Sequence, residues 1–397
     1  MSISAGSMSI TPLALRAGLL RATPYPPPSQ FTSAYGYGDY LKSVAALRLR
    51  GGAPLAMQLH LPPAPLLAQQ RRCVEREIAL QGRLFAGMDT LDRLSVHGAG
   101  SLGVCHLAEL MATLRRWFSL MDDDIGDYAI DAGAGACSPQ HLSDLRALGF
   151  NRVVLQGVVP GAVAAARQAG LRCIGIDIDY GQPGQTVMAL ARTLAEAALA
   201  APDRIALRPW TGSGGADPVT ALDMLGLCIR RLGAAGYLYI GMDHFARPGD
   251  ALALAQRQGR LHRHADGYSS HAASDCIGIG PGALSTTGAS CSENTSDIAA
   301  WCAALEGEVL PIARGMRLTM DQLLRRAISD RLMCNFELSV AAIEQAFPVN
   351  FAEYFAPELR RLDALARAGW LTIDGEWISV NPARRPQIRT VCALFEH

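Results

Sequence analysis

Histidines and arginines cluster between residues 244 and 271. Imidazole nitrogens are common ligands of haem iron and of other metal ions, and guanidinium groups pair with carboxylates through two parallel hydrogen bonds. A histidine is more often a hydrogen-bonded structural residue, and an arginine can be an ordinary solvated charge, so both interpretations stay open. The residues concerned are His244, His262, His264, His271, Arg247, Arg260 and Arg263.

The cysteines are spread too widely to form a motif of the CxxC type. The chain has ten of them, and Cys73 is the only one between Met1 and Cys105. Isolated thiols are typical of reduced, buried side chains in a cytoplasmic protein. We therefore predict a cytoplasmic location, and we expect Cys73 to be a packed thiol near the start of a helix.

The composition excludes several classes of protein. Hydrophobic residues make up 50% of the chain and charged residues 18%, which is typical of a soluble globular protein. The formal net charge is zero, so no basic field would attract nucleic acid or an anionic membrane. No window approaches the run of about 18 apolar residues that a membrane span requires. We expect a monomer without a signal peptide.

Short apolar runs alternate with amphipathic stretches from residue 55 to about residue 244. This alternation predicts an α/β fold of βαβ units, in which helices join parallel strands. Ligands of such folds meet the loops at the carboxyl ends of the strands, so functional residues are expected there. The predicted strands are 55–61, 94–97, 128–131, 152–154, 171–177, 204–207 and 237–241.

Three units are predicted along the chain. Residues 1–54 are rich in Pro, Gly and Ser and form an N-terminal arm outside the core. Residues 55–260 form the α/β barrel. Residues 261–397 form a mainly helical C-terminal domain, in which residues 370–378 predict a hairpin that turns at Asp374-Gly375. Helices followed by a small hairpin indicate a winged-helix-like unit.

Two stretches carry a resemblance to a known family: MDHFARP at residues 242–248 and AQRQGRLHR at residues 255–263. They closely resemble the matching parts of the oxygen-independent coproporphyrinogen III dehydrogenases (oxidases), and the likeness covers nearly the whole chain. The resemblance implies a partial parallel (β/α)6-type barrel, as in radical S-adenosylmethionine (SAM) enzymes. It also implies a substrate with four propionates, for which the arginines and histidines of residues 244–271 are candidate partners.

The resemblance further implies a [4Fe-4S] cluster on a CxxxCxxC loop after the first barrel strand. That strand is MQLHLP at residues 57–62, and the three ligand positions then fall on Ala64, Ala68 and Arg71. Alanine and arginine cannot ligate iron, and no shift of register helps because Cys73 is the only nearby thiol. We therefore expect neither a bound cluster nor a catalytic or metal-ligating residue of the family's kind, with haem or a porphyrin as a possible ligand.

The family's SAM site is only partly retained. The family's Gly-Gly-Gly-Thr-Pro loop corresponds to GAGSL at residues 98–102, and Ala129 replaces an acid of the third strand. The stretch IDIDYGQPGQT at residues 176–186 matches the family well, although its glycine and proline also suit a plain turn. The predicted vestigial SAM site comprises Gly100, Ser101, Asp177, Tyr180 and Gly181.

Three functions are compatible with these features. The first is a cluster-free tetrapyrrole-binding carrier or regulator of haem and porphyrin metabolism. The second is an active coproporphyrinogen III dehydrogenase, which would decarboxylate its substrate oxidatively to protoporphyrinogen IX. The third is a non-catalytic partner of a true family member. Occupancy of the pocket by a small molecule would distinguish the first from the third.

Overall fold

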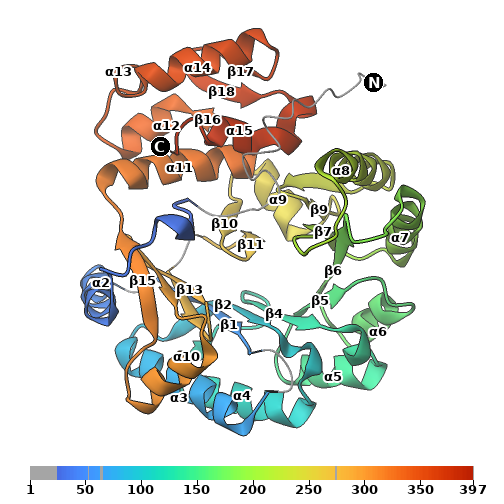
Figure 1. Cartoon of the computed structure of the whole chain (residues 1–397), viewed down its shortest axis with the longest axis vertical. Coiled ribbons are helices and arrows are strands. Elements are labelled where there is room, and N and C mark those ends of the chain that lie inside the picture. The colour runs from blue at the N-terminus through green and yellow to red at the C-terminus, as the bar shows by residue number, and fades with distance from the viewer. Residues whose placement is uncertain (1–24, 52, 63–65, 273–274, 397) are drawn as a thin grey trace.

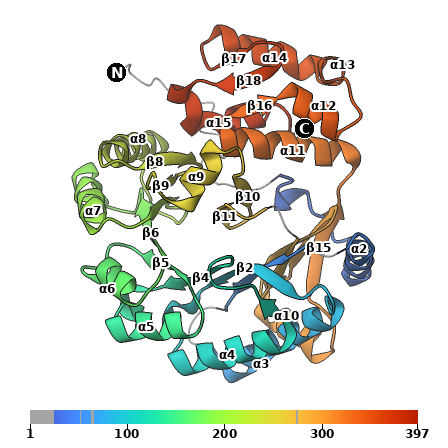
Figure 2. The same cartoon turned by 180° about the vertical axis from the view of Figure 1, so that it is seen from behind.

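The computed structural model describes residues 25–51, 53–62, 66–272 and 275–396. A mixed sheet of 13 strands, with helices on its outer face, is joined to a smaller C-terminal unit (Figures 1 and 2). Six neighbouring strands of this sheet run parallel and form the partial barrel. They are β1 (Leu55–His60), β2 (Thr90–His97), β4 (Asp127–Ala132), β5 (Arg152–Gln156), β6 (Cys173–Tyr180) and β7 (Arg204–Pro209).

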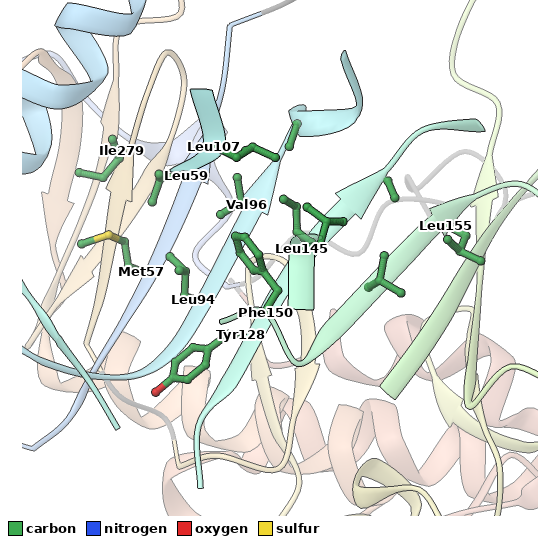
Figure 3. Close-up of a cluster of buried hydrophobic side chains, with 14 of the residues drawn as sticks. Met57, Leu59, Leu94, Val96, Leu107, Tyr128, Leu145, Phe150, Leu155 and Ile279 are labelled. Carbon is green, nitrogen blue, oxygen red and sulfur yellow. The ribbon is translucent and has the colours of Figure 1, made fainter. Parts of the chain in front are cut away.

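Helices cover the outer face of the six strands (Figure 1). Side chains alternate along a strand, so each strand presents one face to these helices and the other to the barrel interior. On β2, Leu94 and Val96 pack outward, and Figure 3 shows them in the same hydrophobic cluster as Tyr128 and Leu155. The covering helices are α3 (Ala68–Leu84), α4 (Val104–Trp117), α5 (Pro139–Ala147), α6 (Ala162–Gln168), α7 (Val187–Ala200) and α8 (Pro218–Ala234).

The seventh predicted strand leaves the parallel pattern. It forms β8 (Leu238–Gly241), which turns at once into β9 (His244–Ala246), and β9 pairs antiparallel with both β8 and β7. The turn residues Met242 and Asp243 have φ of 43° and 66°, the left-handed conformation that a two-residue hairpin requires. The hairpin thus replaces a further parallel strand at this edge of the sheet.

The prediction that helices take over from about residue 261 was wrong for residues 276–317. This stretch extends the main sheet, and its first strand lies parallel to β1. Its strands are short and rich in Gly, Ser and Thr, so their alternation is too weak to be recognised without the sheet edge that they pair with. They are β12 (Cys276–Ile279), β13 (Leu284–Thr287), β14 (Ser290–Asn294) and β15 (Ile312–Arg317), with α10 (Ile298–Glu306) before the last.

The C-terminal unit is mainly helical, as predicted, and has its own hydrophobic cluster. Its three-stranded sheet contains the predicted hairpin, in which Asp374 accepts hydrogen bonds from the amides of Glu376 and Trp377. The elements are α11 (Met320–Asn335), β16 (Glu337–Ser339), α12 (Val340–Ala346), α13 (Phe351–Tyr354), α14 (Ala356–Arg367), β17 (Leu371–Ile373), β18 (Trp377–Val380) and α15 (Ile388–Cys392).

Part of the predicted N-terminal arm belongs to the core. Helix α2 (Tyr37–Leu49) buries Tyr40, Val44 and Leu47 in the main hydrophobic cluster. The hydroxyl of Tyr40 also donates to Oε1 of Gln81, 3.0 Å away in α3. The expectation of an arm outside the core was therefore wrong for this helix, and residues 1–24 lie outside the described part of the chain.

Two further elements connect the barrel to the C-terminal unit (Figure 1). Helix α9 (Ala251–Arg257) follows β9, and the hairpin of β10 (His262–His264) and β11 (Gly267–Ser269) comes next. Within the residues that the structure describes, no helix combines the length and the apolar character needed to cross a bilayer.

Candidate functional site at the barrel mouth

A cavity of about 470 Å³ opens at the carboxyl ends of the parallel strands. Its volume lies in the range of small-molecule sites, and its position is the usual one for ligands of parallel α/β folds. Strands β1, β2 and β7, the β8–β9 hairpin and the β10–β11 hairpin all contribute to its wall. The charged and titratable lining residues used below are His60, His97, Arg208, Asp243, His244, Arg263 and Asp266.

Three buried ion pairs form the floor of the barrel beneath this cavity. Their guanidinium groups come from inward-facing positions of β2, β5 and β7. Buried charges are costly unless they are paired, so each pair holds its strand in place. The pairs are Arg93 with Asp266 at 2.9 Å, Arg152 with Asp127 at 2.7 Å and Arg204 with Asp250 at 3.0 Å.

Two histidines and a carboxylate meet on the β1–β2–β4 side of the mouth. Nδ1 of His97 lies 3.0 Å from Oδ2 of Asp131, while its Nε2 is buried without a hydrogen-bond partner among the described residues. The ring of His60 packs edge-on against that of His97, with centroids 5.1 Å apart. The geometry therefore brings together three residues from three consecutive strands of the sheet.

The two histidines differ in their pKa values. Burial lowers the pKa of His60 to about 4, and the nearby His97 adds to this shift. Burial also opposes protonation of His97, but its hydrogen bond and charge interaction with Asp131 outweigh that effect and raise its pKa. His60 is thus a neutral imidazole at neutral pH, whereas His97 is held by a carboxylate that fixes its orientation.

Arg208 dominates the opposite side of the mouth. Its Nε donates to Oδ2 of Asp177 at 3.0 Å, and 46% of its side chain remains exposed. Burial raises the pKa of Asp243 to about 7, against the opposing effect of Arg208. Burial and the charge of Arg208 both lower the pKa of His244, to about 3. The charges that act on His244 are therefore positive, whereas Asp131 and Asp266 are acidic neighbours of His97.

The predicted SAM positions do not form one site. Asp177 faces the barrel interior, but its carboxylate is paired with Arg208. Tyr180 faces outward into the hydrophobic cluster, because it lies an odd number of positions from Asp177 on the same strand. Gly181 has φ of 77°, which supports its reading as a turn residue.

Gly100 has a packing role. A Cβ on this residue would lie 2.9 Å from the amide nitrogen of Gly133, so the loops after β2 and β4 can touch only if residue 100 lacks a side chain. Ser101 ends the short helix η2 (Ala99–Ser101), and its side chain lies outside the described part of the structure.

The predicted substrate residues are divided between two ends of the barrel. His244 and Arg263 line the mouth cavity. Arg247 is exposed, and its amide donates to the carbonyl of Asp203 just before β7, because β9 runs antiparallel to β7 and ends at the amino edge of the barrel. Arg260 is exposed after α9 and contacts Gln258.

His262, His264 and His271 also lie away from the mouth cavity. His271 pairs with Asp92 near the start of β2 at 3.7 Å, and His262 is close enough for the charge of His271 to affect its pKa. His264 lines a neighbouring cavity of about 170 Å³ beside the N-terminal segment, which shares Arg263 and Leu284 with the mouth cavity. These positions and those of Arg247 and Arg260 are therefore not part of the site proposed below.

Several mouth residues were not predicted, namely His60, His97, Arg208, Asp243 and Asp266. One signal could have revealed some of them. His97 lies four positions after Arg93 on β2, and Arg208 lies four positions after Arg204 on β7. Residues an even number of positions apart share a face of a strand, so these polar side chains are expected together in the barrel interior.

The residues after β1 do not fit an iron–sulfur cluster, which needs three thiolates. Cys73 is 1% exposed and hydrogen-bonded to Cys302 of α10, on the outer side of the sheet, and burial raises its pKa to about 12. Arg71 pairs with Glu109 of α4 at 3.5 Å, while Ala64 lies outside the described residues. In the part of the chain that the structure describes, no three His, Cys, Asp or Glu side chains are arranged to hold a metal ion.

The fold matches a solved radical SAM enzyme. Coproporphyrinogen III oxidase (HemN) from Escherichia coli superimposes with a TM-score of 0.86 and 30% sequence identity, over 94% of this chain and 96% of that chain. The protein therefore belongs to the class of proteins with the radical SAM enzyme fold.

Sequence relatives narrow the class to a family. The oxygen-independent coproporphyrinogen III oxidases of Pseudomonas aeruginosa and E. coli are 33% and 30% identical to it, each over 95% of this chain and 92% of the relative. The HemN C-terminal domain family matches residues 318–384. The chain belongs to the oxygen-independent coproporphyrinogen III oxidase family.

Proposed function

We propose that this protein binds a tetrapyrrole at the barrel mouth and acts as a carrier or regulator in haem metabolism, without the radical reaction of its relatives. One observation carries the proposal. A cavity of about 470 Å³ lined by arginines and histidines coexists with a β1–α3 connection that has no thiol. Ligand binding and cluster binding depend on different residues, so the first can persist without the second.

The charges of the cavity suit a carboxylate-bearing macrocycle. Arg208 bonds Asp177 through Nε alone among the interactions described, and its exposed part can turn other N–H groups toward a propionate. Arg263 lines the same cavity from β10. Tyr268 and Leu284 add apolar wall. These features support binding of a porphyrin with several propionates.

The proposal predicts that anaerobic reconstitution with iron and sulfide leaves no stable [4Fe-4S] cluster, because Ala64, Ala68 and Arg71 offer no thiolate. Iron and acid-labile sulfide would be assayed after gel filtration. A stoichiometry of roughly four irons and four sulfides per chain, as a cubane cluster requires, would favour the active dehydrogenase instead.

Binding of the ligand is tested directly by titrating the protein with coproporphyrin III and with haem. We expect saturable quenching of Trp fluorescence and a higher melting temperature with at least one of them. The absence of both effects for both ligands would contradict the proposal and favour the non-catalytic interaction partner.

A further inference from the structure

We propose that His97 is the iron ligand when the tetrapyrrole is haem, with Asp131 as the residue that positions it. This inference rests on the proposed tetrapyrrole-binding function and names a residue of the same cavity. It also replaces the histidines of residues 244–271, among which the sequence placed the candidate ligands.

The coordination needs of haem explain why one histidine is enough. Among the described His, Cys, Asp and Glu residues, no group of three is arranged to hold a free metal ion. Haem iron arrives with four nitrogen ligands from the macrocycle, so the protein needs to supply only an axial imidazole. A site that cannot hold a free ion can therefore still hold haem.

The orientation of His97 is that of a metal ligand. Its Nδ1 is engaged by Asp131 at 3.0 Å, which leaves Nε2 as the coordinating atom, and Nε2 has no hydrogen-bond partner among the described residues. Ligating histidines usually donate their other ring N–H to a carboxylate or carbonyl, which fixes the tautomer and increases the basicity of the ligand.

The charges around the mouth distinguish His97 from His244. Carboxylates of Asp131 and Asp266 surround His97, and they favour the positive charge of ferric iron. His244 faces Arg208 and Arg263 instead. Its Nε2 also lies beside Gly267, where a Cβ would come within 3.2 Å. The charges nearest each ring therefore favour iron at His97 over iron at His244.

Iron binding requires Nε2 of His97 to become accessible, and the neighbouring ring of His60 is only weakly held. Nε2 of His97 is buried in the ligand-free protein, and the ring of His60 is 5.1 Å from that of His97. Nε2 of His60 lies 3.4 Å from Oε1 of Gln58 on its own strand, a weak contact that rotation of the ring would break at little cost.

The test compares haem with metal-free coproporphyrin III in the full-length wild type and in His97→Ala. We expect the variant to lose or shift the Soret band and to bind haem at least tenfold more weakly, while its affinity for metal-free porphyrin changes less than threefold. An unchanged haem spectrum would overturn the role of His97, and so would an equal loss of metal-free porphyrin binding. Failure of the wild type to bind either compound would instead overturn the proposed function.

Further variants test which histidine ligates the iron. His97→Gly should regain the band when imidazole is added, and a failure to regain it would count against ligation. The exposed control His106→Ala should retain the band. Loss of the band in His244→Ala or His60→Ala, with retention in His97→Ala, would assign the ligand to the other histidine.

Asp131→Asn tests the positioning residue. The band should remain, but the reduction potential of the iron should move to a more positive value, because a neutral amide makes the imidazole a weaker donor to ferric iron. An unchanged potential would show that Asp131 does not act on the iron ligand.

Discussion

Arg208 interacts with three titratable groups at the barrel mouth. It pairs with Asp177, opposes the upward shift of the pKa of Asp243 and lowers the pKa of His244. Arg204 and Arg208 lie four positions apart on the same face of β7, but the surroundings of their guanidinium groups differ. Arg204 is enclosed with Asp250, whereas Arg208 reaches the cavity with almost half of its side chain exposed.

We therefore predict that Arg208→Gln weakens the binding of coproporphyrin III by about tenfold or more, because a hydrogen bond to a charged group contributes about 1.5–3 kcal/mol. Fluorescence titration at constant ionic strength measures the effect. Arg260→Gln removes a guanidinium group that lies outside the cavity and should bind like the wild type. Equal affinities for the wild type and Arg208→Gln would exclude Arg208 as a partner of the propionates.

Among the secondary-structure elements, strand β12 determines where His60 lies. β12 lies parallel to β1, and Leu59 lies opposite Ile279 near the carboxyl ends of the two strands. Gly280 follows β12 with φ of 103°, and a Cβ there would lie 1.9 Å from the carbonyl oxygen of His60. The backbone of β1 can therefore reach the mouth in its observed place only if residue 280 has no side chain.

Gly280→Ala should accordingly lower the free energy of unfolding by at least about 2 kcal/mol, because neither backbone can move away freely and the alanine must adopt a left-handed conformation. Urea denaturation measures this change. Gly249→Ala is the matched control, since its Cβ would meet nothing within 4 Å and its φ is not positive. Similar stabilities for the two variants would contradict the packing argument.

The β10–β11 hairpin joins the two halves of the molecule. It follows α9, which packs with the C-terminal hydrophobic cluster, and its turn enters the barrel. There Asp266 accepts hydrogen bonds from Arg93 at 2.9 Å and from Ser95 at 3.0 Å. Burial opposes the charge of Asp266, but Arg93 and nearby histidines outweigh it and hold the pKa of this carboxyl far below its usual range.

Asp266→Asn leaves the buried charge of Arg93 without its partner, so we predict a loss of about 3 kcal/mol or more in the free energy of unfolding at pH 7. A carboxyl with a depressed pKa stabilises the fold above its unfolded pKa of about 4, and this stabilisation is lost as the pH falls below that value. The gap between wild type and variant should therefore shrink on acidification.

Urea titrations at a series of pH values measure that gap. Glu109→Gln, which removes a partner of the exposed pair with Arg71, serves as the control and should leave the stability unchanged at every pH. A gap that does not depend on pH would show that the charge of Asp266 is not what stabilises the hairpin.

Local patterns were enough to predict much of this molecule. Alternating apolar runs predicted the six parallel strands, because burial between a helical layer and the barrel interior leaves a period of two in the sequence. The missing thiols after β1 are likewise a property of the sequence, since no folding can supply a ligand that the chain lacks. The resemblance to the family rested on linear motifs and was confirmed by the comparisons.

The partners of the charged side chains depended on the order and direction of strands. His60, His97 and Asp131 are far apart in the sequence and meet because β1, β2 and β4 are neighbours whose carboxyl ends share one edge. Arg247 lies at the opposite end of the barrel from the site because β9 runs antiparallel to β7. Tyr180 faces outward because it lies three positions from the inward-facing Asp177 on the same strand. Such contacts arise from pairings between distant segments, and no local pattern in the sequence records them.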